Sequence, residues 1–336
     1  MFGLAQLVKL QDYISRYQID LSRYPTQFVR LKKIQWDRVK QQWVSGEEAP
    51  QWEQLESVEE EKEGRKTFSL FEKLKFKKAP KQIENIEEVE ISHELLSQEN
   101  DEGEIPEEET TLFFEPNIVY HPKTIEELKK MFLDQFFHFQ IKWASSTVRE
   151  KSYVDPKFLR DSFLRNILQR FPDSFLVFYY PIIKVKKAPV ELDIVLLTPT
   201  ECLCITVAEQ ENQAVFVGDG DRFWTKKFGN ASKKMLNPLI QLNRMETVVS
   251  KIFLENDVEM PIRKILLSRN GYFDYPGTVF NVQFVDKRDY PQWMQQLRLS
   301  SSPMKHMQIR AAKAILQTVQ TTSFNRDIWN VEKEQE

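Results

Sequence analysis

Apolar side chains recur every three or four positions in six stretches of the chain, and this spacing predicts helices. Start signals support several of them. Thr124 followed by Glu127 has the pattern of a capping box, Asp155 precedes Pro156 at the first helical position, and Pro25 separates the first two stretches. The predicted helices cover residues 4–21, 28–43, 125–143, 156–171, 237–252 and 303–319.

Other stretches are short and continuously apolar, which is typical of strands buried on both faces. The central pair lies between Pro189 and Ala208, where two strands are joined by the turn Thr198-Pro199-Thr200. Gly218-Asp219-Gly220 has the composition of a hairpin loop. Strands are predicted at 175–180, 189–197, 202–208, 213–217, 222–226, 262–268 and 282–285. Helices alternating with such strands indicate an α/β fold.

Charge divides the chain unevenly. The net charge of the whole chain is only −3, but residues 46–110 hold 21 Asp and Glu against 8 Lys and Arg. Few apolar residues interrupt this stretch, so we expect an acidic, largely disordered linker. The predicted organisation is a helical hairpin (1–45), this linker (46–110), a helical lead-in (111–155), a core (156–270), a strand and helix extension (271–322) and a polar tail (323–336).

Several kinds of site are not indicated. Cys202 and Cys204 fall on one predicted strand and are interpreted as small buried apolar residues. The four histidines have no ligand spacing, and the chain has only nine glycines and no phosphate-binding loop motif. We find no signal peptide and no apolar run of 18 residues, so the sequence predicts a protein of the cytoplasm without a transmembrane segment.

Glu191 and Asp193 are the residues that most need an explanation. They lie two positions apart on the predicted strand and would share one of its faces. Ionised groups that are buried are costly unless they are paired or bound to a metal. They are therefore either a pair satisfied by basic side chains or backbone donors, or the remnant of a metal site.

The motifs around these residues resemble the nuclease-related domain family (NERD), whose fold is of the restriction-endonuclease-like PD-(D/E)xK type. Residues 192–197 (LDIVLL) are similar to its first strand motif, and Ile205 stands where its second strand has an isoleucine. Trp224, Asn237, Pro238 and Gln241 match its later tryptophan and the start of an N-P-x-x-Q helix. The resemblance covers about 156–270 and implies a mixed-sheet core flanked by helices.

In nucleases of this type two acids hold a divalent metal, and a lysine stabilises charge at the phosphate. The resemblance assigns the first acid to Asp193. It places the second acid and the lysine at positions 206 and 208, where this chain has Thr206 and Ala208. Both reactive groups of the second motif are therefore replaced.

Replacements elsewhere in the chain remain open. Glu191 and Asp161 are candidates for the second acid, whereas Glu209 points away from Thr206 unless a bulge intervenes. The cation would have to come from the predicted hairpin or the following helix. The candidates are Lys226, Lys227, Lys233 and Lys234.

The sequence thus favours a catalytically degenerate nuclease-related protein that binds nucleic acid or a protein without being an enzyme. The first alternative is a metal-dependent nuclease with migrated residues, and only this alternative requires Mg²⁺ or Mn²⁺ at Asp193 and Glu191. The second is an adaptor that binds a protein partner through residues 1–45 or 124–145. The basic and aromatic composition of 1–45 also fits contact with nucleic acid.

Overall fold

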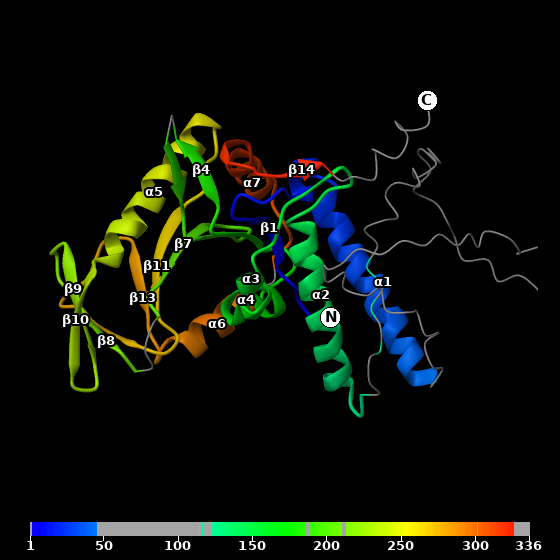
Figure 1. Cartoon of the computed structure of the whole chain (residues 1–336), viewed down its shortest axis with the longest axis horizontal. Coiled ribbons are helices and arrows are strands. Elements are labelled where there is room, and N and C mark those ends of the chain that lie inside the picture. The colour runs from blue at the N-terminus through cyan, green and yellow to red at the C-terminus, as the bar shows by residue number, and fades with distance from the viewer. Residues whose placement is uncertain are drawn as a thin grey trace, which may run out of the picture. The chain divides into compact units, whose positions relative to one another are not determined.

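A computed structural model describes residues 2–45, 114, 116, 118, 122–185, 188–209, 213–300 and 302–325. The predicted acidic linker at 46–110 lies outside these residues. The centre of the fold is a mixed sheet of six strands in the order β1-β3-β6-β7-β11-β13 (Figure 1). These strands are β1 (Gln6–Leu10), β3 (Leu176–Tyr179), β6 (Ile194–Leu197), β7 (Cys202–Val207), β11 (Ile262–Leu267) and β13 (Val282–Val285).

The sheet is mixed because β6 runs against its two neighbours. β6 is antiparallel to β3 and to β7, while β1 pairs in parallel with β3, and β11 pairs in parallel with β7 and β13. All residues of β3 and β6 are buried, as their apolar composition predicts. The mixed sheet confirms the predicted α/β class.

Helices cover both faces of this sheet. On one face lie α1 (Tyr24–Ser45), α2 (Ile125–Trp143), α5 (Pro238–Glu255) and α7 (His306–Thr318), which share an apolar core with Phe178, Val195 and the two cysteines. The other face packs against α3 (Pro156–Leu159), α4 (Ser162–Arg170) and α6 (Tyr290–Leu299). Both cysteines are buried and free, as predicted.

A second sheet extends from the core at the end marked β8 to β10 in Figure 1. It has the order β10-β9-β8-β12, formed by β8 (Val215–Val217), β9 (Phe223–Phe228), β10 (Ala231–Leu236) and β12 (Tyr272–Asp274). The Trp224 ring packs directly on Gly218, where an added Cβ would lie 2.3 Å from the ring. Two smaller sheets join β4 (Ile182–Val185) to β5 (Ala188–Glu191), and β14 (Phe324–Asn325) to β2 (Glu150–Lys151).

The prediction of a helix at 4–21 is wrong. Gln6–Leu10 is the edge strand β1, and a short 3-10 helix, η1 (Arg16–Gln18), follows it. All residues from Leu4 to Leu10 are buried, so the three-residue spacing of the leucines reflects a strand covered on both faces. The second predicted helix of this region is present as α1.

Other elements also differ from the prediction, and α6, β4, β10 and β12 were not predicted at all. Helix 156–171 is divided into α3 and α4, because Asp161 caps a new helix start. Strand 189–197 is interrupted, since the chain bends at Asp193 between β5 and β6. The predicted polar tail contributes β14, whereas residues 326–336 lie outside the described part.

Candidate functional site

Several polar side chains gather at one edge of the central sheet. The strands β1, β3, β7 and β11 run in the same direction, so their carboxyl ends meet there, and the antiparallel β6 begins at this edge. In open α/β sheets this is the edge at which ligands usually bind. We call it the carboxyl edge; its polar residues are Asp161, Tyr179, Tyr180, Asp193, Thr206, Glu209 and Arg269.

Asp193 lies directly opposite Thr206, because the antiparallel register pairs Ile194 with Ile205. The Thr206 hydroxyl donates a hydrogen bond of 2.6 Å to Asp193 Oδ2, and Gln241 Nε2 donates one of 3.2 Å to Oδ1. Burial raises the pKa of Asp193 above its usual value, and these two hydrogen bonds oppose the rise. Both carboxylate oxygens thus have donors from within the protein.

The later residues of the family motif explain how Gln241 reaches this place. Asn237 caps α5 by accepting from the backbone N–H of Leu239, and its Nδ2 donates to Asp221 O in the β8–β9 loop. The indole N–H of Trp224 donates to the same loop, at Asp219 O. These contacts fix the start of α5, from which Gln241 extends one turn later toward Asp193. Trp224 and Asn237 therefore act as structural residues.

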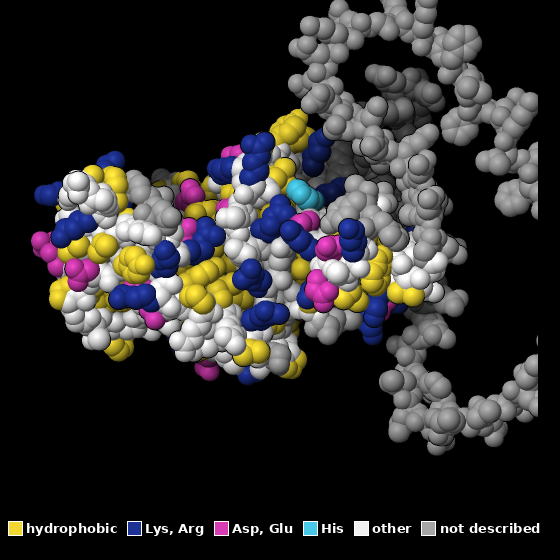
Figure 2. Space-filling model, turned by 90° about the horizontal axis from the view of Figure 1, so that it is seen from below, with side chains coloured by type: hydrophobic (Ala, Val, Ile, Leu, Met, Phe, Trp, Pro, Cys, Tyr) yellow, Lys and Arg dark blue, Asp and Glu magenta, His cyan; other side chains and the backbone are white. Residues whose placement is uncertain are grey.

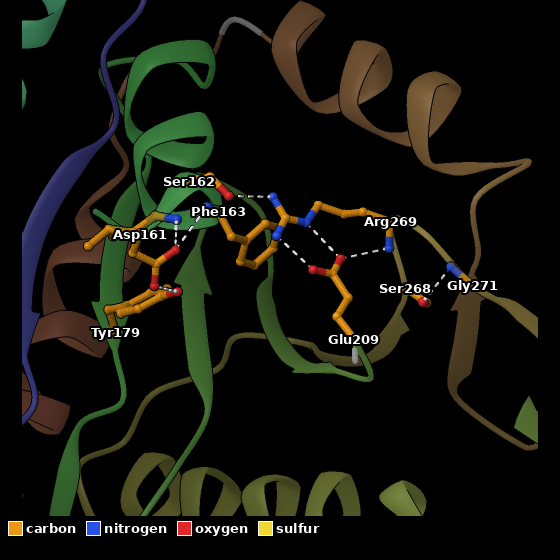
Figure 3. A network of polar contacts seen from close by, with 9 residues as sticks. Asp161, Ser162, Phe163, Tyr179, Glu209, Ser268, Arg269 and Gly271 are labelled. Atoms are coloured by element: carbon orange, nitrogen blue, oxygen red, sulfur yellow. Dashed lines mark hydrogen bonds and ion pairs between the residues drawn. The ribbon is translucent and has the colours of Figure 1, made fainter. Parts of the chain in front are cut away.

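Asp161 has a structural role in the same region (Figure 3). Its Oδ1 accepts from the backbone N–H groups of Phe163 and Leu164, as expected of a helix N-cap. Its Oδ2 accepts a hydrogen bond of 2.6 Å from the Tyr179 hydroxyl. No hydrogen bond or ion pair joins Asp161 to Asp193 among the described residues.

Glu209 and Arg269 form the second cluster in Figure 3. Arg269 donates from Nε and Nη2 to the two Glu209 carboxylate oxygens, both at 2.6 Å, and its backbone N–H donates to Oε1. A fork of this kind is among the strongest ion pairs in proteins. This ion pair links the ends of β7 and β11. Its acid, Glu209, is the residue that follows the second strand of the motif.

Tyr180 is a residue of this edge that sequence reasoning missed. Its backbone lies in the left-handed region, with φ of 50°, and its N–H donates to Asp193 O. Burial raises the pKa of Tyr180 to about 12, with further contributions from the charges of Asp193, Asp161 and Glu191. The three predicted acids therefore act on one tyrosine. The feature that singles out Tyr180 is its strained backbone in the turn between β3 and β4. The sequence Tyr-Tyr-Pro does not reveal that strain.

The acidic side chains at this edge are not arranged as the ligands of a metal site with two carboxylates. Glu191 is exposed, and its backbone carbonyl rather than its carboxylate accepts from Gln241. Ala208 is buried at the predicted lysine position. Within the described residues there is no group of three His, Cys, Asp or Glu that could hold a metal ion.

The lysines considered as migrated cations belong to the second sheet. Lys226 is buried with its amine 5.2 Å from the Phe228 ring centre, while Lys227, Lys233 and Lys234 are exposed. Among the described residues the Asp193 carboxylate accepts hydrogen bonds from Thr206 and Gln241, and none of these lysines is a partner. The structure therefore does not bring them together with Asp193.

Comparison with known proteins adds three findings. The model of the nuclease-related domain family matches residues 159–268. An RNA 2′,3′-cyclic phosphodiesterase of Geobacillus stearothermophilus is 47% identical over 47 residues, which are 14% of this chain and 15% of that protein. No solved structure matches the chain. The structure also has no helix, in its described part, that is long and apolar enough to cross a membrane.

Proposed function

We propose that the nuclease-related domain at residues 159–268 has lost catalysis and serves to bind nucleic acid. The observation that carries the proposal is the hydrogen bonding of Asp193. Thr206 and Gln241 occupy its carboxylate oxygens, at the place where a nuclease needs a metal and a second acid. Ala208 supplies no charge for the phosphate.

The alternative of an active nuclease with migrated residues receives less support. Asp161 caps a helix, Glu209 is engaged by Arg269, and Glu191 is exposed. Each acid that would have to join Asp193 thus has another partner or another environment. An interaction with a protein partner alone has no specific observation in its favour.

The outer face of the β9–β10 hairpin fits a nucleic acid strand. In the antiparallel register Phe223 lies opposite Leu236, and both are 52% exposed. Lys227 and Lys234 are exposed on the same face, since residues two or four apart share a side of a strand. Lysines beside an exposed aromatic ring provide phosphate contacts and a surface for base stacking.

The relative from Geobacillus supports the inclusion of RNA among the ligands. By its name, that protein acts on RNA with a 2′,3′-cyclic phosphate. Because the match is short, we take from it only that RNA is a ligand class to test with this chain. We therefore propose single-stranded RNA and DNA as the ligands of the hairpin face.

Binding to labelled single-stranded RNA and DNA at several salt concentrations tests the proposal. We expect the affinity to fall steeply with salt, and the variant Lys227→Gln/Lys234→Gln to reduce the slope of log K against log salt by about 1.4, or about 0.7 for each lysine. Phe223→Ala should weaken binding by about 1–3 kcal/mol. The control is Lys130→Gln/Lys251→Gln, which removes two exposed lysines of helices α2 and α5. Equal losses in the two lysine double variants would refute the assignment of the hairpin face.

A further inference from the structure

An open groove lies at the other end of the central strands from Asp193. Its volume is about 760 Å³, and it is lined by the N-terminal segment, α2, the end of α4, residues 172–174, the end of α6 and residues 302–303. We call it the basic groove, for the three cations Lys129, Arg170 and Arg298 that line it. Seen from below, Lys and Arg side chains gather between the positions of α6 and α2 (Figure 2).

Two of these cations are close enough to influence each other. Burial lowers the pKa of Lys129, and the charge of Arg298 lowers it further, while Glu126 opposes the effect. Lys129 and Arg298 line the same groove, and an anion bound there would stabilise these like charges. In the described ranges none of the three cations forms an ion pair with a carboxylate.

Among the described residues that line the basic groove, the one acid is already neutralised. Asp173 accepts from the buried amine of Lys32 and, at 2.6 Å, from the backbone N–H of Leu4. The Lys32 amine also donates to Phe2 O at 2.9 Å. Asp173 and Lys32 thus cancel, and the charges of Lys129, Arg170 and Arg298 remain in excess.

The floor of the basic groove is fixed in place. Gly3 packs so closely on residues 171–172 that an added Cβ would lie 2.8 Å from Phe171 O. The backbone carbonyl of Ser174 accepts from the buried Gln308 side chain at 2.5 Å. The Ser174 side chain is itself buried, and its hydroxyl has no hydrogen-bond partner in the described structure. The hydroxyl is therefore enclosed within the floor and does not open into the basic groove.

We propose that the basic groove is a binding site for a phosphate group, held by Lys129, Arg170 and Arg298. Three cations above a rigid floor suit a small, doubly charged oxyanion. The phosphate group comes either from free inorganic phosphate or from the phosphorylated end of a nucleic acid strand.

This site is separate from the carboxyl edge. Leu176 pairs with Leu197, and Tyr179 pairs with Ile194, so the strands β3 and β6 have their opposite ends at the two places. Ser174 lies beyond the first pair, and Asp193 lies beyond the second. The inference therefore does not rest on the proposed binding of nucleic acid at the hairpin face.

Calorimetric titration of the full chain with inorganic phosphate, in a chloride buffer, tests the proposal. A second titration compares two oligonucleotides of one sequence, with a 5′-phosphate and with a 5′-hydroxyl. The test variant is Lys129→Gln/Arg298→Gln. The control is Lys130→Gln/Lys251→Gln, which makes the same change of charge at exposed positions outside the basic groove. Circular dichroism establishes that both variants are folded.

We expect the test variant to raise the Kd for phosphate by about tenfold or more, and the control to leave it unchanged. If the test variant loses the preference for the 5′-phosphorylated strand, the bound phosphate group belongs to the end of a nucleic acid strand. If the test variant loses only its binding to inorganic phosphate, the ligand is the free ion. If neither titration distinguishes the wild type from the test variant, or if the control loses as much affinity, the proposal is wrong. A chain that binds phosphate but no nucleic acid would refute only the function proposed for the hairpin face.

Discussion

The two ends of the strand pair β3 and β6 differ in what their charged groups contact. At the carboxyl edge Asp193 accepts from Thr206 and Gln241, and Glu209 is held by Arg269. At the basic groove Asp173 is paired with Lys32, whereas the lining cations Lys129, Arg170 and Arg298 form no ion pair with a carboxylate among the described residues, and Lys129 lies over the Phe2 ring.

The part of the chain that resembles a nuclease is therefore not the part whose charged groups lack carboxylate partners. The carboxyl edge carries the motif that resembles a nuclease, but its acids are bound by neighbouring side chains of the protein. The basic groove has no recognisable motif, yet its charges are available to a ligand. We infer that polar groups with internal partners now stabilise the fold, whereas those in excess mark a place for binding.

The largest expected effect is that of Lys32→Met at the basic groove. The change leaves Asp173 without its cation. Breaking a fully buried pair costs about 3–5 kcal/mol, and because the Asp173 side chain is 25% exposed we expect the lower end of that range, about 3 kcal/mol. Urea denaturation measures the loss, and Lys33→Met, at the exposed neighbour on α1, is the control. The double variant Lys32→Met/Asp173→Asn should recover part of the stability. Without such a recovery, the pair would not be the source of the loss.

Thr206→Glu tests the carboxyl edge by restoring a second acid where the motif has lost one. It replaces the donor to Asp193 with a second carboxylate, so repulsion should lower the stability by about 2 kcal/mol without metal. Mn²⁺ should then raise the melting temperature of this variant, because two facing carboxylates suit a divalent ion. Thr206→Gln has a similar size and no charge, and should not respond to Mn²⁺. A wild type that responds as strongly as Thr206→Glu would contradict the account.

Asp193→Asn should have a smaller effect, one that depends on pH. The folded pKa of Asp193 is raised, so the folded state binds its proton more tightly than the unfolded state does. Its contribution to stability is therefore greatest at acid pH and decreases as the pH rises from the unfolded pKa through the folded one. At pH 7 we expect the free energy of unfolding to change by no more than about 1 kcal/mol. As the pH falls, the stability of the wild type should increase relative to that of the variant.

The control for this pH dependence is Asp155→Asn. Hydrogen bonds from Lys157 hold the pKa of Asp155 below its usual value, so its stabilising contribution is lost as the pH falls. The two variants should thus change in opposite directions between about pH 7 and pH 3, a range that spans the usual Asp pKa. Thermal unfolding at several pH values measures this, and parallel changes would mean that Asp193 is not buried as described.

The smallest effect on stability is expected for Ser174→Ala. The variant removes a buried hydroxyl without a partner in the described structure, so the stability should stay constant or rise by less than about 1 kcal/mol. Ser145→Ala is the contrast, since the Ser145 hydroxyl donates to Ile141 O at 2.8 Å and its removal should destabilise. Thermal unfolding of both variants gives the comparison. A destabilised Ser174→Ala would show that this hydroxyl already has a partner.

Much of the fold could be predicted from local patterns. The apolar runs located β3, β6 and β7, and the helix signals located α2 and α5, because period and capping are local properties. The strand β1 was missed, since leucines three apart in a fully buried strand imitate a helix.

The site could be predicted only in part. The motif identified Asp193 and the replacements at Thr206 and Ala208, but Asp161 had to be seen in place before its role as a helix cap was clear. The basic groove unites Lys129, Arg170 and Arg298, which are far apart in the sequence. Only the folded chain brings them together.

The most direct test of the account is the cleavage of labelled single- and double-stranded DNA and RNA with Mg²⁺ or Mn²⁺. The wild type is compared with Asp193→Asn and with Asp193→Ala. We predict no divalent-dependent cleavage by the wild type, together with salt-sensitive binding of single strands in the same samples. Cleavage by the wild type that both substitutions abolish would contradict the account, because Asp193 would then hold a catalytic metal.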